Sequence, residues 1–183
     1  GVLWVLDNGV LRFDYKSIKD LKPIPLLIKN IKLNNEQISW NSLREGTYPV
    51  GTKDSLTAVN EIALKFGRTF SDEDFRQMSD VFGNVSYDRD TGSSFIPVNL
   101  VLPIKNNNIT FEFGSESTSF GKAIQYQYKL EGYDKNWSPL NSKTEASFGN
   151  MGEGNYTFHV KALSPFGSWS EASYSFKVLP HWY

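Results

Sequence analysis

The stretch that decides the fold is residues 123–163, AIQYQYKLEGYDKNWSPLNSKTEASFGNMGEGNYTFHVKAL. Apolar and aromatic residues occupy every second position at its beginning and again near its end; they are Ile124, Tyr126, Tyr128 and Leu130, then Tyr156, Phe158, Val160 and Ala162. Polar residues fill most positions between them. Because successive side chains of a β-strand point to opposite faces, each segment predicts a strand with one face in a core and the other in water. Two such strands with aromatic interiors predict a layered β-domain.

The composition of the 183-residue chain excludes several classes of protein. Its 19 basic and 20 acidic residues give a net charge of −1, so we expect no nucleic-acid partner. The lack of cysteine excludes disulfides and thiolate metal sites, but it leaves the cellular compartment open. The apolar runs are far shorter than the roughly 20 residues that cross a bilayer as a helix.

Around this centre the sequence predicts three regions. Residues 1–22 open with a β-hairpin, VLWVLDNGVLRFD, in which Asp-Asn-Gly is the turn between two apolar strands. A two-stranded hairpin is marginally stable alone, so we expect it to be the remnant of a larger sheet. Residues 23–96 are expected to form a connecting β segment with one inserted short helix, and its β-branched residues 26–33 predict a strand. Residues 97–183 are expected to form the main domain.

The helix of the connecting segment has clear boundary signals. Ser71 is a capping residue, and three acidic residues follow it in the first turn, where the helix dipole favours negative charge. Gly83 is a natural stop, so we expect a helix of about three turns. Before it, the alternation of Ile62, Leu64 and Phe66 predicts another strand.

Residues 97–183 contain about six short alternating segments separated by turn residues, which is typical of an immunoglobulin or fibronectin type III sandwich. Gly132 and Gly154 are expected in turns with positive φ, which a side chain would strain. The predicted fold is therefore mainly β: an immunoglobulin-like or fibronectin type III-like sandwich with an N-terminal β extension and one short helix.

No set of residues predicts a catalytic, cofactor-binding or metal site. His159 falls on the outward face of its strand and His181 near the end of the sequence, which favours surface positions over catalysis. Residues 87–94, YDRDTGSS, begin like a calcium-binding loop but lack the glutamate that closes an EF-hand, which favours a turn. No pattern places two glutamates at one cleft. We therefore expect neither an enzyme nor a bound cofactor.

The central motif resembles a known family. YQYKLEGYDKNWS, followed by GEGNYTFHVKA, a Gly-Ser-Trp segment and LPHWY, is similar to the three-tyrosine (Y_Y_Y) domain of bacterial hybrid two-component sensors. The resemblance covers residues 97–183 and rests on these positions: Tyr126, Tyr128, Leu130, Glu131, Gly132, Trp137, Gly154, Tyr156, Phe158 and Trp169. The opening hairpin resembles the last strands of a two-component regulator β-propeller blade, which precedes this domain in that family.

The resemblance implies the periplasmic part of an inner-membrane protein. In such sensors a propeller detects a ligand, often a glycan, and the three-tyrosine sandwich joins it to a transmembrane helix and a histidine kinase. It implies a non-catalytic signal-transmission module that contacts the propeller and works as a homodimer, with Trp182 and Tyr183 next to the membrane. The alternative is a carbohydrate-binding β-sandwich, which requires exposed aromatic residues gathered on one concave face.

Overall fold

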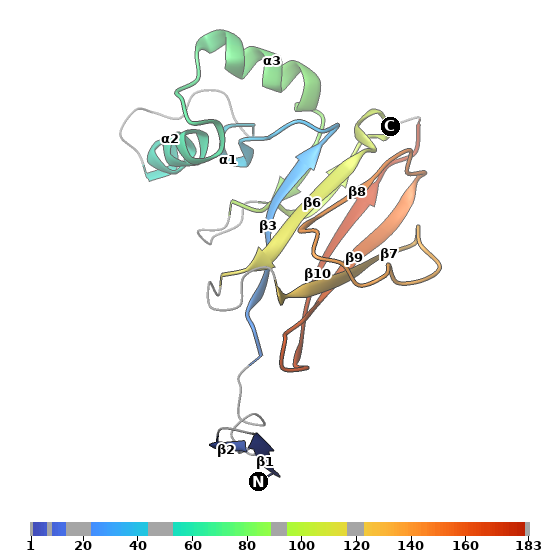
Figure 1. Ribbon diagram of the computed structural model, residues 1–183. Coiled ribbons are helices and arrows are strands. Elements are labelled where there is room, and N and C mark those ends of the chain that lie inside the picture. Colours follow the sequence, from blue (N-terminus) through green and yellow to red (C-terminus); the bar gives the residue numbers. More distant parts are fainter. Residues whose placement is uncertain are drawn as a thin grey trace.

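The computed structural model describes residues 2–6, 9–13, 23–43, 53–88, 95–116 and 123–181 (Figure 1). Two sheets pack face to face and confirm the predicted β-sandwich. The smaller sheet has the order β3 (Leu26–Leu33), β6 (Ile109–Ser115), β8 (Glu145–Phe148). The larger has the order β4 (Ser86–Asp88), β5 (Val98–Leu102), β10 (Trp169–Val178), β9 (Gly154–Leu163), β7 (Gln125–Glu131). Only the β5–β10 pair among these is parallel in the described strands.

The core between the sheets is aromatic, as the period-2 pattern predicts. Phe158 of β9 is 0% exposed and stacks on Phe111 of β6, with ring centroids 4.2 Å apart and parallel planes. Tyr126, Tyr156 and the other inward residues of β7 and β9 are buried with them. Tyr128, on the same strand as Tyr126, is half-buried and packs against this core.

The sandwich begins earlier than the expected boundary at residue 97. Strand β3 pairs antiparallel with β6 from Leu26, opposite Ser115, to Leu33, opposite Ile109. The predicted strand at residues 26–33 is therefore confirmed. It is a strand of the smaller sheet, so it belongs to the sandwich and not to a separate connecting segment. Backbone pairing to β6 and burial of its apolar residues against the common core hold it there.

The structure has more helix than the single short helix expected. That helix is α3 (Asp72–Phe82), and its capping box is present: the Ser71 side chain accepts from the Asp74 amide, and the Asp74 side chain accepts from the Ser71 amide. Also present are α1 (Trp40–Leu43), α2 (Lys53–Phe66) and the 3₁₀ turn η2 (Ile104–Asn106).

The strand predicted from Ile62, Leu64 and Phe66 is wrong, because all three residues lie in α2. The buried positions of that helix are Ala58, Glu61 and Ile62, spaced by three and four residues as a helix requires. Ile62, Leu64 and Phe66 alternate by chance, and the helical repeat of 3.6 residues decides which side chains of α2 are buried.

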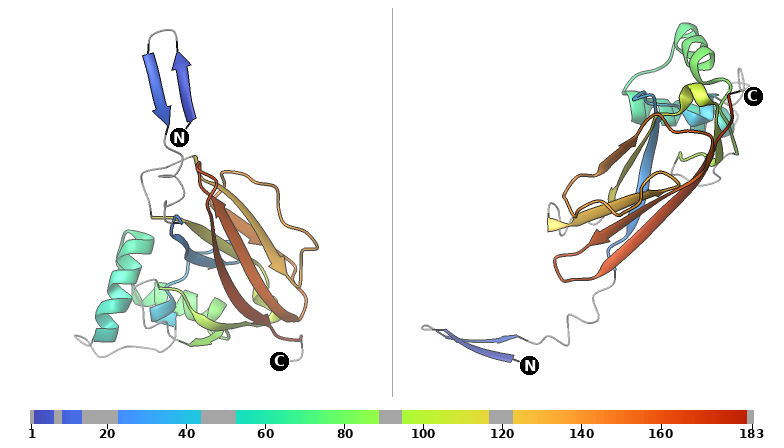
Figure 2. Two further views of the ribbon diagram at one scale, coloured as in Figure 1. Left: turned by 90° about the horizontal axis from the view of Figure 1, so that it is seen from below. Right: turned by 90° about the vertical axis from the view of Figure 1, so that its right-hand side faces the viewer.

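The two strands that enter and leave the sandwich run in the same direction along it. Strand β3 starts at one end, and β10 finishes at the other, where the three α-helices also lie (Figures 1 and 2). Apart from them, β1 (Val2–Leu6) and β2 (Gly9–Phe13) pair as the predicted hairpin in a sheet of their own; turn residues 7 and 8 lie outside the described residues. No helix in the described part of the chain is long and apolar enough to cross a membrane.

Candidate functional site

The motif tyrosines lie on β7 and β9 and build one side of the aromatic core. Tyr126 makes an edge contact with Phe113, with centroids 5.4 Å apart, and Tyr128 makes one with Phe148 at 6.1 Å. Leu130, at the end of β7, is fully buried. These residues attach the edge strand of the larger sheet to the smaller sheet, which is a packing role.

The turn that follows β7 explains the glycine of the motif. Gly132 has φ +93°, and a Cβ there would lie 2.9 Å from the Asn155 carbonyl oxygen and 3.0 Å from the Tyr156 ring. The Asp134 carboxylate accepts a hydrogen bond of 2.8 Å from the Leu130 amide and closes the turn. The expectation of positive φ is confirmed here and at Gly154, where φ is +149°.

Tyr156 connects β9 with the strand that leaves the sandwich. Its hydroxyl donates to the Gly152 carbonyl at 2.9 Å, and its ring stacks on Phe176 of β10, with centroids 5.4 Å apart. Burial raises the pKa of the hydroxyl, which therefore stays a donor at neutral pH. Through this contact the motif packs against β10 near the end of that strand, where the chain leaves the sandwich.

Glu131 and Trp137 of the motif lie on the outer face of the larger sheet. The Lys161 ammonium lies over the Trp137 ring, 4.2 Å from its centroid, and His159 Nε2 is 3.0 Å from Glu131 Oε2. His159 Nδ1 is 3.7 Å from a carboxylate oxygen of Glu171. The outward position expected for His159 is thus confirmed, and within the described residues no group of three or more potential ligands is placed to hold a metal.

Trp169 lies apart from the rest of the motif. It begins β10 at the end of the sandwich where β3 enters, and it is 46% exposed. Beside it, the Ser170 hydroxyl donates to the Ile24 carbonyl, so the starts of β10 and β3 are joined. Trp182 and Tyr183, expected next to a membrane, lie outside the described residues.

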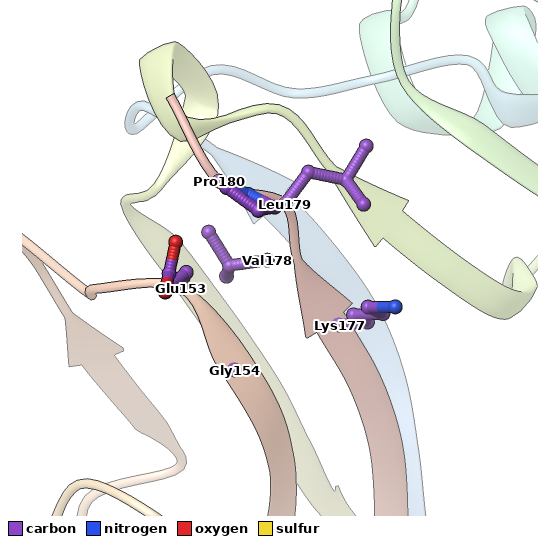
Figure 3. A pocket seen from close by; sticks show the side chains of 6 residues that line it. All are labelled: Glu153, Gly154, Lys177, Val178, Leu179 and Pro180. Carbon is purple, nitrogen blue, oxygen red and sulfur yellow. The ribbon is translucent and has the colours of Figure 1, made fainter. Parts of the chain in front are cut away.

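The end of β10 forms the exit from the sandwich. Val178 is fully buried, and the next amide, of Leu179, donates to the Leu102 carbonyl at 2.8 Å. A shallow hollow of about 420 Å³ lies here, with Glu153 just before β9, Lys177 on β10 and Val178 between them (Figure 3). The last described residues of β10 are therefore anchored to both of its neighbours.

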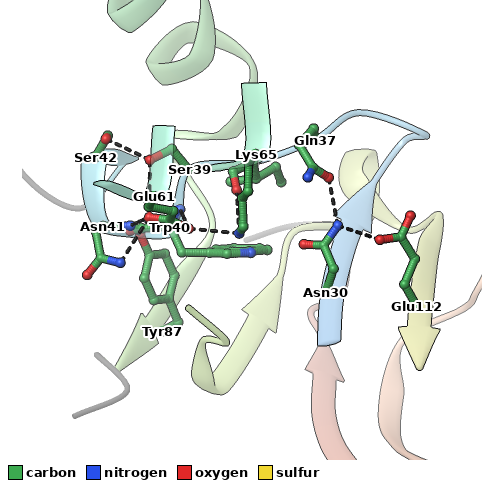
Figure 4. A network of polar contacts seen from close by, with 11 residues as sticks. Asn30, Gln37, Ser39, Trp40, Asn41, Ser42, Glu61, Lys65, Tyr87 and Glu112 are labelled. Carbon is green, nitrogen blue, oxygen red and sulfur yellow. Dashed lines mark hydrogen bonds and ion pairs between the residues drawn. The ribbon is translucent and has the colours of Figure 1, made fainter. Parts of the chain in front are cut away.

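A buried polar network that the sequence did not predict joins the helices to the sandwich (Figure 4). Glu61 of α2 is 0% exposed and accepts hydrogen bonds from the backbone amides of Trp40 and Asn41, at 2.9 and 2.7 Å. Lys65, one helical turn later, forms an ion pair with it at 2.7 Å and donates to the Ile38 carbonyl. The only sequence signal for this network is the i, i+4 spacing of a glutamate and a lysine.

Comparison with known proteins identifies part of the chain. Residues 117–179 match the Y_Y_Y domain. No curated protein sequence matches the chain.

Among solved structures, two of the extracellular domain of BT4673 from B. thetaiotaomicron are similar to the chain. One is described as a candidate hybrid two-component system; its TM-score is 0.53 and its sequence identity is 19%. The similarity covers 90% of this chain and 17% of the BT4673 chain. The other, described as a candidate one-component system, has TM-score 0.51 and 19% identity, covering 88% and 16%. The extracellular domain of the candidate hybrid two-component system BT3049 of the same organism has TM-score 0.49 and 17% identity, covering 97% and 19%.

The chain thus spans about a sixth of the length of the BT4673 structures. At this level of identity the structures show a shared fold. Residues 117–179 are thus similar in sequence to the Y_Y_Y domain, and the whole sandwich shares its fold with part of the extracellular domain of BT4673.

Proposed function

We propose that the chain is a non-catalytic signal-transmission module of a periplasmic sensor, which couples ligand detection by an upstream propeller to a transmembrane histidine kinase. The observation that carries this proposal is the path of the chain: β3 enters the sandwich at one end and β10 leaves it at the other (Figure 2). A domain placed between a detector and an effector has to connect two ends in this way.

The packing between those ends suits the transmission of a displacement. Protein cores are as dense as organic crystals and deform little, so a tightly packed sandwich moves as a rigid body. Here the aromatic core joins both sheets, and the Ser170–Ile24 hydrogen bond joins the starts of the two strands. Strand β10, with 10 residues, then extends over about 33 Å to the exit.

The proposal includes a homodimer in the periplasm, attached to the inner membrane. In a homodimer, a two-fold interface between two sandwiches allows the copies to move relative to each other, and such a movement is what the kinase would detect. Trp182 and Tyr183 then lie at the membrane interface, where amphipathic aromatic rings are favoured. The rest of the gene provides a first test: a transmembrane helix and a histidine kinase directly after Tyr183 are expected, and a different downstream region contradicts the proposal.

A mechanical test uses the full-length protein in cells with a reporter for its regulated gene. Inserting Gly-Gly-Ser between Pro180 and His181 separates the rigid exit strand from the following segment, so ligand should no longer change reporter output. The same insertion between Ser142 and Lys143, in the exposed connection from β7 to β8, should leave the response intact. Equal responses of both variants, at equal protein levels in the membrane, contradict rigid coupling.

The carbohydrate-binding alternative requires a platform of exposed aromatic rings. In the described residues the exposed rings do not gather on one face: Phe75 is on α3 and Tyr133 follows β7, while Phe166 and Trp169 are at the turn from β9 to β10. One face of Trp137 is already covered by Lys161. We therefore keep signal transmission as the proposed function; calorimetric binding of oligosaccharides to this chain alone would reverse that choice.

A further inference from the structure

A hollow of about 560 Å³ lies between α3, the connection from α2 to α3, and the turn that follows β3. This volume is within the range of sites that hold small organic molecules. None of its residues belongs to the three-tyrosine motif or to the strands that carry the proposed signal. The hollow therefore represents a separate candidate site, at the same end of the sandwich as the exit (Figure 1).

The inner part of this hollow is apolar. Phe66 and Phe70 meet edge to face with centroids 4.6 Å apart, and Met78 and Phe82 of α3 line the same space. Phe82 is buried, while Phe66, Phe70 and Met78 are half-buried and thus offer surface to a ligand. An apolar ligand body placed here gains free energy by leaving water.

The outer part of the hollow carries uncompensated negative charge. Arg68 is the one cation among its lining residues, and both of its terminal nitrogens are bound by the Asp74 carboxylate, at 2.8 and 2.7 Å. Glu36 and Asp80 also line the hollow, and within the described residues neither forms an ion pair. The lining thus has a net charge of −2, from three carboxylates and one guanidinium.

From the apolar floor and the acidic rim we propose that this hollow binds a small organic cation, a protonated amine or guanidinium carried on an apolar body. The body packs against Phe66, Phe70 and Met78, and the cation lies near the carboxylates of Glu36 and Asp80. Opposite charges attract across such a partly exposed rim, whereas an organic anion of the same shape is repelled by it. Because Glu36 follows β3 and Asp80 lies on α3, the bound cation connects the helices to the sandwich.

The test is an NMR titration of the 183-residue chain with three probes of similar shape. They are 2-phenylethylamine, which is cationic, 2-phenylethanol, which is neutral, and 3-phenylpropanoate, which is anionic. The amine should shift amide signals around Phe70 and Asp80 and bind at least fivefold more tightly than the alcohol, while the propanoate should cause no shifts there. High salt should reduce the advantage of the amine.

Matched variants separate the charge from the shape of the site. The Glu36→Gln/Asp80→Asn double variant should bind the amine no better than the alcohol, whereas Asp72→Asn, on α3 but outside the hollow, should bind it normally. Native-like amide spectra verify that each variant is folded. Equal shifts with amine and propanoate, shifts on another surface, unchanged binding in the double variant, or no binding up to the solubility limit overturn the proposal. Binding of an Arg-Phe peptide without binding of the free amine also overturns it, because the occupant is then a peptide.

Discussion

Replacing Glu61 with Gln tests how the helices are attached to the sandwich. Oε2 of this buried carboxylate accepts hydrogen bonds from Ser39 Oγ at 3.1 Å, the Asn41 amide at 2.7 Å and Asn41 Nδ2 at 2.9 Å. Oε1 accepts from the Trp40 amide at 2.9 Å and Lys65 Nζ at 2.7 Å. Gln keeps one of these oxygens and places an NH₂ group, which is a donor, against the remaining donors.

The expected cost is about 3 kcal/mol. Removing one partner of a buried ion pair typically costs about 3–5 kcal/mol, and a buried donor left without an acceptor costs about 1–3 kcal/mol. Burial lowers the pKa of Lys65, and Glu61 opposes this effect, so replacing Glu61 with Gln should lower that pKa further. Because a lower pKa makes the charged form of Lys65 easier to neutralise, we expect a cost at the lower end of that range.

Urea denaturation and amide hydrogen exchange measure the effect. In Glu61→Gln the amides of α1 and α2 should exchange faster, and adding Lys65→Met should cost less than the sum of the two single changes, because it removes the unpaired cation. Glu73→Gln, on the exposed face of α3, is the matched control and should change stability by less than about 0.5 kcal/mol. An effect of Glu61→Gln equally small would refute the reasoning that this network holds α2 in place.

Three further predictions concern single residues. Phe158→Ala should lower the free energy of unfolding by about 3–5 kcal/mol, since it leaves a cavity against Phe111, and should lower the melting temperature in calorimetry by roughly 10 °C. Gly132→Ala should lower the free energy of unfolding by about 1–3 kcal/mol in denaturation experiments, because φ is +93° and the new Cβ lies 2.9 Å from a carbonyl oxygen. Gly132→Asn should be destabilised as well, because Asn tolerates positive φ better but its Cβ makes the same close contact. The hydrogen bonds from Arg68 and from Ser71 lower the pKa of Asp74 below its ordinary 3.8, so its stabilisation of α3 should be present above that pH and disappear as the pH falls below it. Hydrogen exchange of α3 in the native protein and in Asp74→Asn should therefore differ at pH 6 and converge in acid, and a constant difference would contradict this assignment.

The strands of the sandwich were predictable because their pattern is redundant. In β9 every inward position is apolar or aromatic and most outward positions are polar, so no other period fits residues 154–163. The capping box of α3 was equally legible, because Ser71 and Asp74 satisfy backbone groups within a few residues. In both cases the information that decides the structure is local.

Helix α2 was missed because its buried face is mixed. Glu61 is buried there beside Ala58 and Ile62, whereas Leu56, Val59 and Leu64 are exposed. Hydrophobic periodicity assumes that apolar residues face the core and charged residues face water. Only the tertiary partners of Glu61, which lie about 20 residues earlier in the chain, make its burial favourable, and they cannot be read from the helix itself.

The place of β3 in the sandwich was hidden for a related reason. Its pattern predicts a strand, but pairing with β6 joins residues about 80 positions apart and depends on a register that no local signal specifies. The hollow near Phe70 was likewise invisible, since Glu36 and Asp80 come together only when β3 and α3 are in place. Sites assembled from distant segments require the fold to be known first.

The two kinds of attachment imply that the parts of this molecule lose structure independently. The sheets are held by an aromatic core, whose disruption removes the common support of β3, β6, β9 and β10. The helices depend on a polar network centred on Glu61. Its loss leaves hydrogen-bond donors without an acceptor in α1 and α2, and it leaves the core between the sheets intact. Local opening follows the weaker of such units, so Glu61→Gln should accelerate exchange in the helices while the amides of β9 stay protected. Phe158→Ala should instead lower protection in β9 and in the helices together. If Glu61→Gln lowers both equally, the helices and the sandwich unfold as one cooperative unit, and a rigid signal path that bypasses the helices is no longer tenable.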